Sequence, residues 1–176
     1  MWLKNIIIIN KKVGVLMNES GLTCCFTGHR PDKLNQTENE IKQLLEKAID
    51  EAIRIGCTTF ITGMAMGVDI WAAEIVLRQM NNNSNIHLIC ALPHPNFEKR
   101  RTETEIARYN KILSLADEVV EVNNHYYMGC YQVRNEWMVD RSSLVIAVFN
   151  GKKSGTKNTI DYANRKSVKV VNVLES

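Results

Sequence analysis

The stretch that decides the fold is CTTFITGMAMGVDIWAAEIVL, residues 57–77. Residues 58–61 are a short β-prone run, and a helical pattern follows the loop. Between them, Gly63 and Gly67 let the backbone turn sharply and let a bound molecule approach closely. A helix that begins after such a loop points its free amide groups and its positive dipole end towards the loop. The stretch therefore predicts either an ordinary strand-to-helix turn or a phosphate-binding loop.

The same alternation of strand and helix continues along the chain. Strand-like runs cover residues 23–27, 58–61, 86–92, 118–122, 144–149 and 168–173. Helical patterns cover residues 41–53, 68–80, 98–115, 131–141 and 156–165. Several strands are apolar throughout, which is typical of parallel strands covered by helices on both faces. We therefore expect one doubly wound α/β domain with a mostly parallel sheet of about six strands.

The N-terminal segment lacks the features of a targeting sequence. Its apolar run, residues 6–9, ends at Asn10. A signal peptide or a membrane span needs a longer apolar run. We expect residues 1–16 to be an extension outside the core, residues 17–176 to form the domain, and no membrane to be involved.

The composition is that of an ordinary globular protein, with 45% hydrophobic and 23% charged residues and a net charge of +3. So weak a positive charge does not require a nucleic-acid partner. The five cysteines have no C-x-x-C spacing and mostly occupy apolar runs. This pattern predicts buried free thiols, a reducing cytoplasmic location and no metal site.

The loops after the predicted strands hold the residues expected to bind a ligand, because ligands of such sheets bind beyond the carboxyl ends of the strands. Residues 28–30 follow the first strand, residues 63–67 the second, and residues 154–156 end the loop after the fifth. Together they predict a site for a phosphate-bearing ligand. The expected ligand-binding residues are Gly28, His29, Arg30, Gly63, Met64, Ala65, Gly67, Asp69, Arg134, Asn135, Ser154, Gly155 and Thr156. None of them is assigned a catalytic role.

Several of these residues also have a plain structural explanation. Asp69, at a helix start, could cap free amides or reach a ribose hydroxyl. Arg134 could hold a ligand or pair with Glu136 or Asp140. Residues 154–156 fit either a simple helix cap or a second anion-binding helix start. The convergence of the loops on one rim of the sheet favours ligand binding.

The stretch at residues 57–77 also contains a tryptophan and two methionines whose roles can be considered from sequence. Trp71 either stacks on a base or packs in the core, and one turn into an amphipathic helix the core is the more usual place. Met64 and Met66 are expected to line the loop and not to bind a ligand through sulfur.

Four ordered motifs extend the argument. They are FTGHRP at 26–31, TGMAMGVD at 62–69, YQVRN at 131–135 and GTKNT at 155–159. They resemble the YpsA-like family of the SLOG superfamily, which also contains the DNA-processing protein DprA (Smf) and the "Lonely Guy" nucleotide hydrolases. The resemblance covers about residues 22–174.

The resemblance implies a Rossmann-like domain that binds a nucleotide or a nucleotide-derived molecule, such as an ADP-ribose-like compound or a nucleoside monophosphate. The hydrolase branch has a carboxylate shortly after the position of Thr156, whereas Lys157, Asn158 and Thr159 stand here. Acid–base help in N-glycosidic cleavage needs such a group. The sequence therefore favours a regulatory or sensor protein over an enzyme, with no cofactor beyond that ligand.

Two other functions stay open. One is a nucleotide N-glycosidic (phosphoribo)hydrolase in which Asp69, Glu74 or Asp140 acts as acid or base. The other is single-stranded DNA binding as in DprA, against which the weak net charge and the mixed-sign helix at 98–115 argue without excluding it. The apolar residues around Trp137 leave room for a homodimer.

Overall fold

The computed structural model describes residues 21–97 and 102–175. The expected extension, residues 1–16, lies outside them. The sheet has six strands in the order β4-β3-β2-β1-β5-β6, and every neighbouring pair is parallel. The strands are β1 Leu22–Gly28, β2 Cys57–Thr62, β3 His87–Leu92, β4 Glu118–Glu121, β5 Leu144–Val148 and β6 Lys169–Asn172. This is the expected α/β, Rossmann-like fold.

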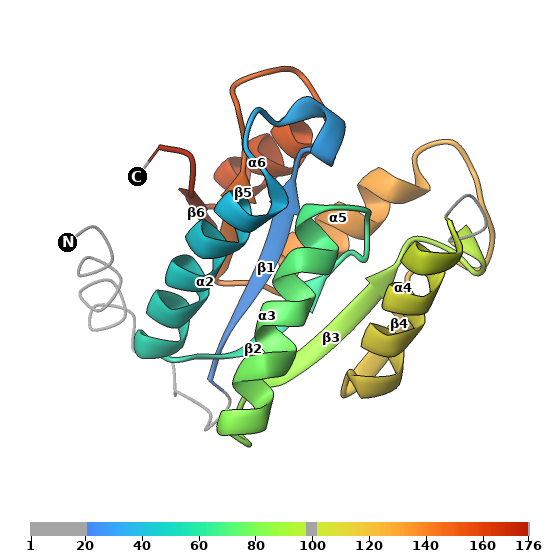
Figure 1. The fold of residues 1–176 in the computed structure, drawn as a ribbon. Helices are drawn as coiled ribbons and strands as arrows, with labels where there is room; N and C mark the ends of the chain where they lie inside the picture. The colour runs from blue at the N-terminus through green and yellow to red at the C-terminus, as the bar shows by residue number, and fades with distance from the viewer. Residues whose placement is uncertain (1–20, 98–101, 176) are drawn as a thin grey trace.

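Helices cover both faces of the sheet (Figure 1). One face carries α2, α3 and α4, and the other carries α5 and α6. The helices are α2 Glu38–Arg54, α3 Val68–Asn82, α4 Glu103–Leu115, α5 Cys130–Asp140 and α6 Gly155–Arg165, with a 3-10 turn, η1, at Pro31–Lys33. Among the described residues, no helix combines the length and the apolar character that crossing a membrane requires.

The helix starts follow from local sequence. Thr37 forms a capping box at the start of α2, because its backbone N–H donates to Glu40 Oε2 at 2.7 Å and its hydroxyl oxygen accepts from the Glu40 amide at 3.3 Å. Thr102 and Glu105 form the same box before α4. The helix expected over 98–115 therefore begins at Glu103 in the described chain, since Thr102 is extended and caps it.

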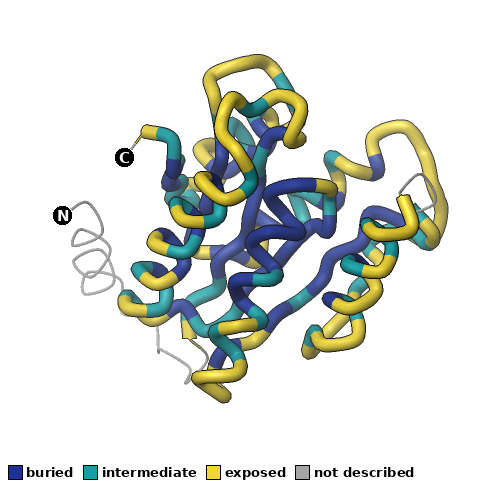
Figure 2. Tube along the Cα trace, in the orientation of Figure 1, coloured by how far each residue is buried: buried dark blue, intermediate teal, exposed yellow. Residues whose placement is uncertain are grey.

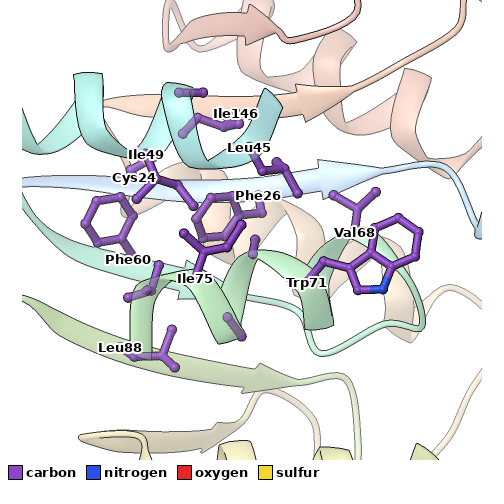
Figure 3. Packing of buried hydrophobic residues seen from close by; sticks show 14 of the residues in the cluster. Cys24, Phe26, Leu45, Ile49, Phe60, Val68, Trp71, Ile75, Leu88 and Ile146 are labelled. Atoms are coloured by element: carbon purple, nitrogen blue, oxygen red, sulfur yellow. The ribbon is translucent and has the colours of Figure 1, made fainter. Parts of the chain in front are cut away.

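The core lies on both sides of the sheet because the strands are apolar on both faces (Figure 2). Alternate residues of β1 point to opposite faces, so Phe26 packs under α2 and α3 while Cys25 packs under α5 and α6. Figure 3 shows Phe26, Phe60 and Ile146 in the first of these layers. All five cysteines are buried and free, as expected, and burial raises the pKa of the Cys25 thiol to about 12.

The strand order creates a crevice at one place. Strand β1 pairs with β2 on one side and with β5 on the other. The connections after β1 and after β5 therefore lead away in opposite directions and leave a gap beyond the carboxyl ends. A ligand site is expected at this gap, between the loops at residues 29–37 and 149–154.

Candidate functional site

A cavity of about 260 Å³ opens at this gap, and we call it the switch-point cavity. It is lined by the loops after β1, β2 and β5 and by the first turns of α5 and α6. The lining gathers these predicted residues: Gly28, His29, Arg30, Ala65, Asp69, Arg134, Asn135, Ser154, Gly155 and Thr156. Segments that are far apart in the sequence therefore line one open cavity.

Three predicted residues do not line this cavity. A Cβ atom on Gly63 would lie 2.2 Å from Arg134 Nη1 and 2.7 Å from Asp69 Oδ2, so Gly63 makes room for the protein's own side chains. Met64 is fully buried in the core, with a φ of 58°, and so does not line the loop surface. Gly67 borders a neighbouring cavity. The expected close approach of a ligand at Gly63 is therefore replaced by the close approach of Arg134.

Arg134 is buried and links the ends of β2 and β3 by hydrogen bonds. Its side chain is 4% exposed, and Nη1 donates to the carbonyl oxygens of Gly63 and, at 3.2 Å, of Ala91. Burial lowers the pKa of this guanidinium, and the Asp69 carboxylate offsets part of that shift. Glu136 and Asp140, the pairing partners considered from sequence, bond other side chains.

Asn135 continues this network towards α6. Its Oδ1 accepts from Arg134 Nε at 2.9 Å, and its Nδ2 donates to Thr159 Oγ1 at 3.1 Å. The Thr159 hydroxyl in turn donates to the Gly155 carbonyl at 2.9 Å. The ends of β2 and β3 are thus tied through α5 to the first turn of α6.

Asp69 places a negative charge in the first turn of α3. Its Oδ2 accepts from the Ala65 amide at 3.1 Å, and the Thr62 hydroxyl donates to its carbonyl at 2.9 Å. A phosphate in the loop at residues 63–67 would lie next to this carboxylate and be repelled. Asp69 therefore holds the loop before α3 and does not cap the helix, and its carboxylate makes the loop unfavourable for phosphate.

The start of α6 has the opposite character. Ser154 caps the helix, accepting from the Lys157 amide at 3.2 Å. The amides of residues 155–156 belong to the first turn, whose N–H groups have no partners within a helix. No acidic residue lies in that turn, and the exposed residues Arg30 and Lys33 line the same cavity. The start of α6 is therefore the positively charged end of the cavity.

His29 is an enclosed ring on the wall of the cavity. It is 3% exposed and stacks on Phe149 with 5.4 Å between ring centroids. Burial lowers the pKa of His29, and the nearby Lys33 charge lowers it further. Both ring nitrogens are buried. The Asn150 side chain favours the protonated ring and so offsets part of the lowering of the pKa. His29 is therefore neutral at neutral pH.

The carboxylates considered for a hydrolase are spread over the molecule. Glu74 pairs with Arg108, away from the cavity lining, and Asp140 accepts from Tyr162 at 2.9 Å on the far part of α5. Of the three candidates, Asp69 is the one that lines the cavity. Within the described chain, no cluster of three His, Cys, Asp or Glu side chains could hold a metal ion.

Four lining residues were not predicted from sequence: Phe26, Thr27, Lys33 and Tyr131. Met66, which was expected to line the loop, borders the cavity. Phe26 and Thr27 lie near the carboxyl end of β1, where such residues are expected to face a ligand. Lys33 ends the 3-10 turn that Pro31 begins, three residues after Gly28. The sequence Pro-Asp-Lys at this place could therefore have indicated that Lys33 lies near the ligand.

Comparison with known proteins places this geometry in a family. The family model YpsA, described as the YspA SLOG family, matches residues 24–172. The chain belongs to this SLOG family. It is 31% identical over 144 residues to the SPbeta prophage-derived protein YoqJ of Bacillus subtilis, covering 74% of this chain and 84% of YoqJ. It is 30% identical over 118 residues to a UPF0398 protein of Halalkalibacterium halodurans, covering 66% of this chain and 62% of that protein.

Solved structures of DNA processing protein A share the fold of this SLOG protein. The Helicobacter pylori protein, whose structure is described for its single-stranded DNA binding mode, aligns with a TM-score of 0.60 at 19% identity. The Streptococcus pneumoniae protein aligns with a TM-score of 0.56 at 15% identity. Each alignment covers 85% of this chain, but 63% and 49% of those chains respectively, which is less than two thirds of their lengths.

Proposed function

We propose that this SLOG protein binds a nucleotide or a nucleotide-derived small molecule in the switch-point cavity and acts as a regulatory or sensor protein. The observation that carries the proposal is the positive end of the cavity, where the first amides of α6 lie beside Arg30 and Lys33. Backbone amides at a helix start and flexible cations are the groups that bind phosphate. Family membership and the crevice position support the same ligand class.

The two ends of the cavity fit two parts of such a ligand. The start of α6 follows β5 and the start of α3 follows β2, and these strands flank β1 on opposite sides. Phosphate fits at the α6 end. Asp69, at the α3 end, is an acceptor-only group that suits ribose hydroxyls, which donate hydrogen bonds.

The chemistry of the cavity favours binding over hydrolysis. Its one carboxylate among the three candidates, Asp69, is already held by the Ala65 amide and lies beside the buried Arg134 charge. A carboxylate that protein donors already hold is poorly placed to exchange a proton with a ligand, and the lining brings no second candidate carboxylate to share acid–base work. Incubation with AMP or ADP followed by chromatography is therefore expected to give no free base. Release of adenine would favour the hydrolase.

Calorimetry with ADP and adenosine tests the binding proposal. ADP is expected to bind at least about tenfold more tightly than adenosine, because only ADP carries the anionic group. Arg30→Ala should weaken ADP binding by about tenfold while leaving adenosine unaffected. Lys47→Ala is the matched control, since Lys47 is an exposed cation on α2 outside the cavity lining. Equal affinity for ADP and adenosine would contradict the proposal.

Single-stranded DNA is the second candidate, favoured by one observation. Tyr126 is 64% exposed and lies 6.5 Å, between ring centroids, from Tyr131, which lines the cavity. Exposed aromatic rings beside a basic site are the platform on which such proteins stack bases. Labelled oligo(dT) in a salt titration decides between the two. Tight binding that falls steeply with salt and is lost in Tyr126→Ala would favour DNA.

A further inference from the structure

A second cavity, of about 230 Å³, lies beside the first, and we call it the Trp71 cavity. Its apolar lining comes from Pro31, Met66, Ile70 and Trp71. Its polar lining comes from Gln36, Glu38, Glu105 and Arg108. An apolar surface with a few converging polar groups is the usual composition of a small-molecule site.

Trp71 is placed there by the packing of α3. It is 4% exposed and belongs to the core, as expected from its position one turn into the helix. Figure 3 shows its indole beside Val68, at the first turn of α3. The part of the indole that is not covered by the core forms part of the cavity wall. Trp71 is therefore a core residue, the more usual of the two roles considered from sequence, and it also borders the cavity.

The two cavities share a wall. Met66 lines both, and its side chain is 38% exposed. Next to it, Gly67 lies so close to Pro31 that a Cβ atom would stand 2.7 Å from Pro31 Cδ. This contact joins the loop after β2 to the loop after β1. The boundary between the cavities therefore consists of this contact and of the flexible Met66 side chain, and a ligand would lie across Met66.

The charges of the two cavities are complementary to the two parts of a nucleotide. The switch-point cavity has Arg30 and Lys33 at its rim, whereas the Trp71 cavity has two carboxylates, Glu38 and Glu105, and one guanidinium, Arg108. Arg108 and Glu38 neutralise each other, since Arg108 Nη2 lies 2.6 Å from Glu38 Oε1. Arg108 also pairs with Glu74, and Glu38 also pairs with Lys42.

A largely apolar cavity whose guanidinium is already paired with carboxylates is a poor site for phosphate. It accepts a flat, uncharged ring whose amino group can donate to a carboxylate.

The spacing of the elements sets the length of the ligand. The α6 start and the α3 start lie beyond β5 and β2, which are two strand spacings apart, roughly 10 Å. The Trp71 cavity lies on the other side of Met66 from the switch-point cavity. Asp69 stands between the positive end and the Trp71 cavity, at the α3 start. A diphosphate gives a nucleoside additional reach along this path.

We propose that the Trp71 cavity binds the base of a nucleoside diphosphate-type ligand, with the ribose near Asp69 and the diphosphate between Arg30, Lys33 and the start of α6. This placement rests on the proposed function, because it assigns the phosphate end to the switch-point cavity. It adds the ligand's length and the site of its base.

The test fills the mouth of the Trp71 cavity without touching the other cavity. Gln36 is exposed and lines the Trp71 cavity, so Gln36→Trp places an indole in its mouth. Its neighbour Asn35 is exposed and outside both linings, so Asn35→Trp is the matched control. The probes for calorimetry are ADP and inorganic pyrophosphate, which lacks a base.

Gln36→Trp is expected to lose about tenfold or more in ADP affinity and to keep the wild-type affinity for pyrophosphate. Asn35→Trp should match the wild type with both probes. Wild-type ADP affinity in Gln36→Trp overturns the base placement alone, as long as pyrophosphate binds. If neither ADP nor pyrophosphate binds the wild-type protein, the proposed function and the base placement both fail.

Fluorescence gives a direct second readout. The chain has three tryptophans, so the double variant Trp2→Phe and Trp137→Phe leaves Trp71 as the one indole. ADP is expected to change its emission, because the base lies against the part of the indole that borders the cavity, whereas pyrophosphate should not. Saturable ADP binding without a change in emission overturns the placement and points to the tyrosines near Tyr131 as the base site.

Discussion

The space that Arg134 occupies at the ends of β2 and β3 exists because residue 63 is a glycine. From sequence alone, Gly63 indicated the close approach of a ligand, because a glycine in a strand-to-helix loop fits both explanations equally. Nothing in the local pattern shows that a side chain 71 positions later in the chain fills the space. Asp69 is similar, since its spacing predicted a cap or a ribose contact and only the three-dimensional arrangement shows it bonded to Ala65.

Replacing Gly63 with alanine tests this residue-scale explanation. Gly63→Ala is expected to lower the free energy of unfolding by about 1–3 kcal/mol, because the added methyl group overlaps the buried Arg134 guanidinium. Chemical denaturation measures it. Gly155→Ala is the control, since nothing lies within 4 Å of its Cβ position, and its stability should stay near that of the wild type. Equal stability of the two variants would argue against the close contact between residue 63 and Arg134.

His29 gives a prediction of pH dependence. Burial and Lys33 keep its folded-state pKa below the unfolded value of about 6.5. As the pH falls below about 6.5, the unfolded chain binds the proton first, so the free energy of unfolding decreases until the pH passes below the folded pKa. Denaturation from about pH 7.5 to about pH 5 should show that His29→Gln loses less stability than the wild type. Parallel curves would show that His29 is not shifted.

At the scale of the elements, periodicity predicted the helices, but it did not predict the starts of α2 and α4 or the contacts between helices. The capping boxes of Thr37 and Thr102 are four-residue patterns, so they indicate where α2 and α4 begin. The link between α5 and α6 depends on Asn135 meeting Thr159, which are 24 positions apart. The side of the helix that each residue faces follows from periodicity, but the partner on another helix does not.

A hydroxyl deletion tests this link between helices. Thr159→Val removes the buried hydroxyl that accepts from Asn135 and donates to the Gly155 carbonyl. We expect a loss of about 0.5–1.5 kcal/mol in the free energy of unfolding. Thr104→Val, at an exposed position on α4, should change stability by less than about 0.5 kcal/mol.

In combination with Asn135→Ala, Thr159→Val should lose less than the sum of the single losses, since both variants break one chain of hydrogen bonds. Strict additivity of the two losses would show that the two side chains act independently.

At the scale of the whole molecule, the strand order decides where function is possible. The reversal at β1 brings the loops after β1, β2 and β5 together, and with them residues from four separate parts of the chain. A ligand in this place contacts elements on both halves of the sheet. Binding should therefore stabilise the whole domain and not a single loop.

Thermal unfolding with added ADP tests this coupling. At an ADP concentration of about 100 times Kd, the free energy of unfolding should rise by about 2.7 kcal/mol. For a domain of this size the expected increase in Tm is roughly 5–10 °C. Adenosine at the same concentration is the control and should give a much smaller increase. An unchanged Tm with ADP would mean that the cavity does not hold it.

The sequence by itself determined the alternation of strand and helix, the α/β class, the buried cysteines and most of the residues that meet at the carboxyl ends of the strands. These features follow from periodicity, capping and loop composition, which act within a few residues. Only the tertiary structure decided that Asp69 makes the loop at residues 63–67 unsuitable for phosphate and that the positive end lies at α6. It also showed the Trp71 cavity beside it. The physical reason is that charge and space at a site are sums over side chains from distant segments, which no local pattern contains.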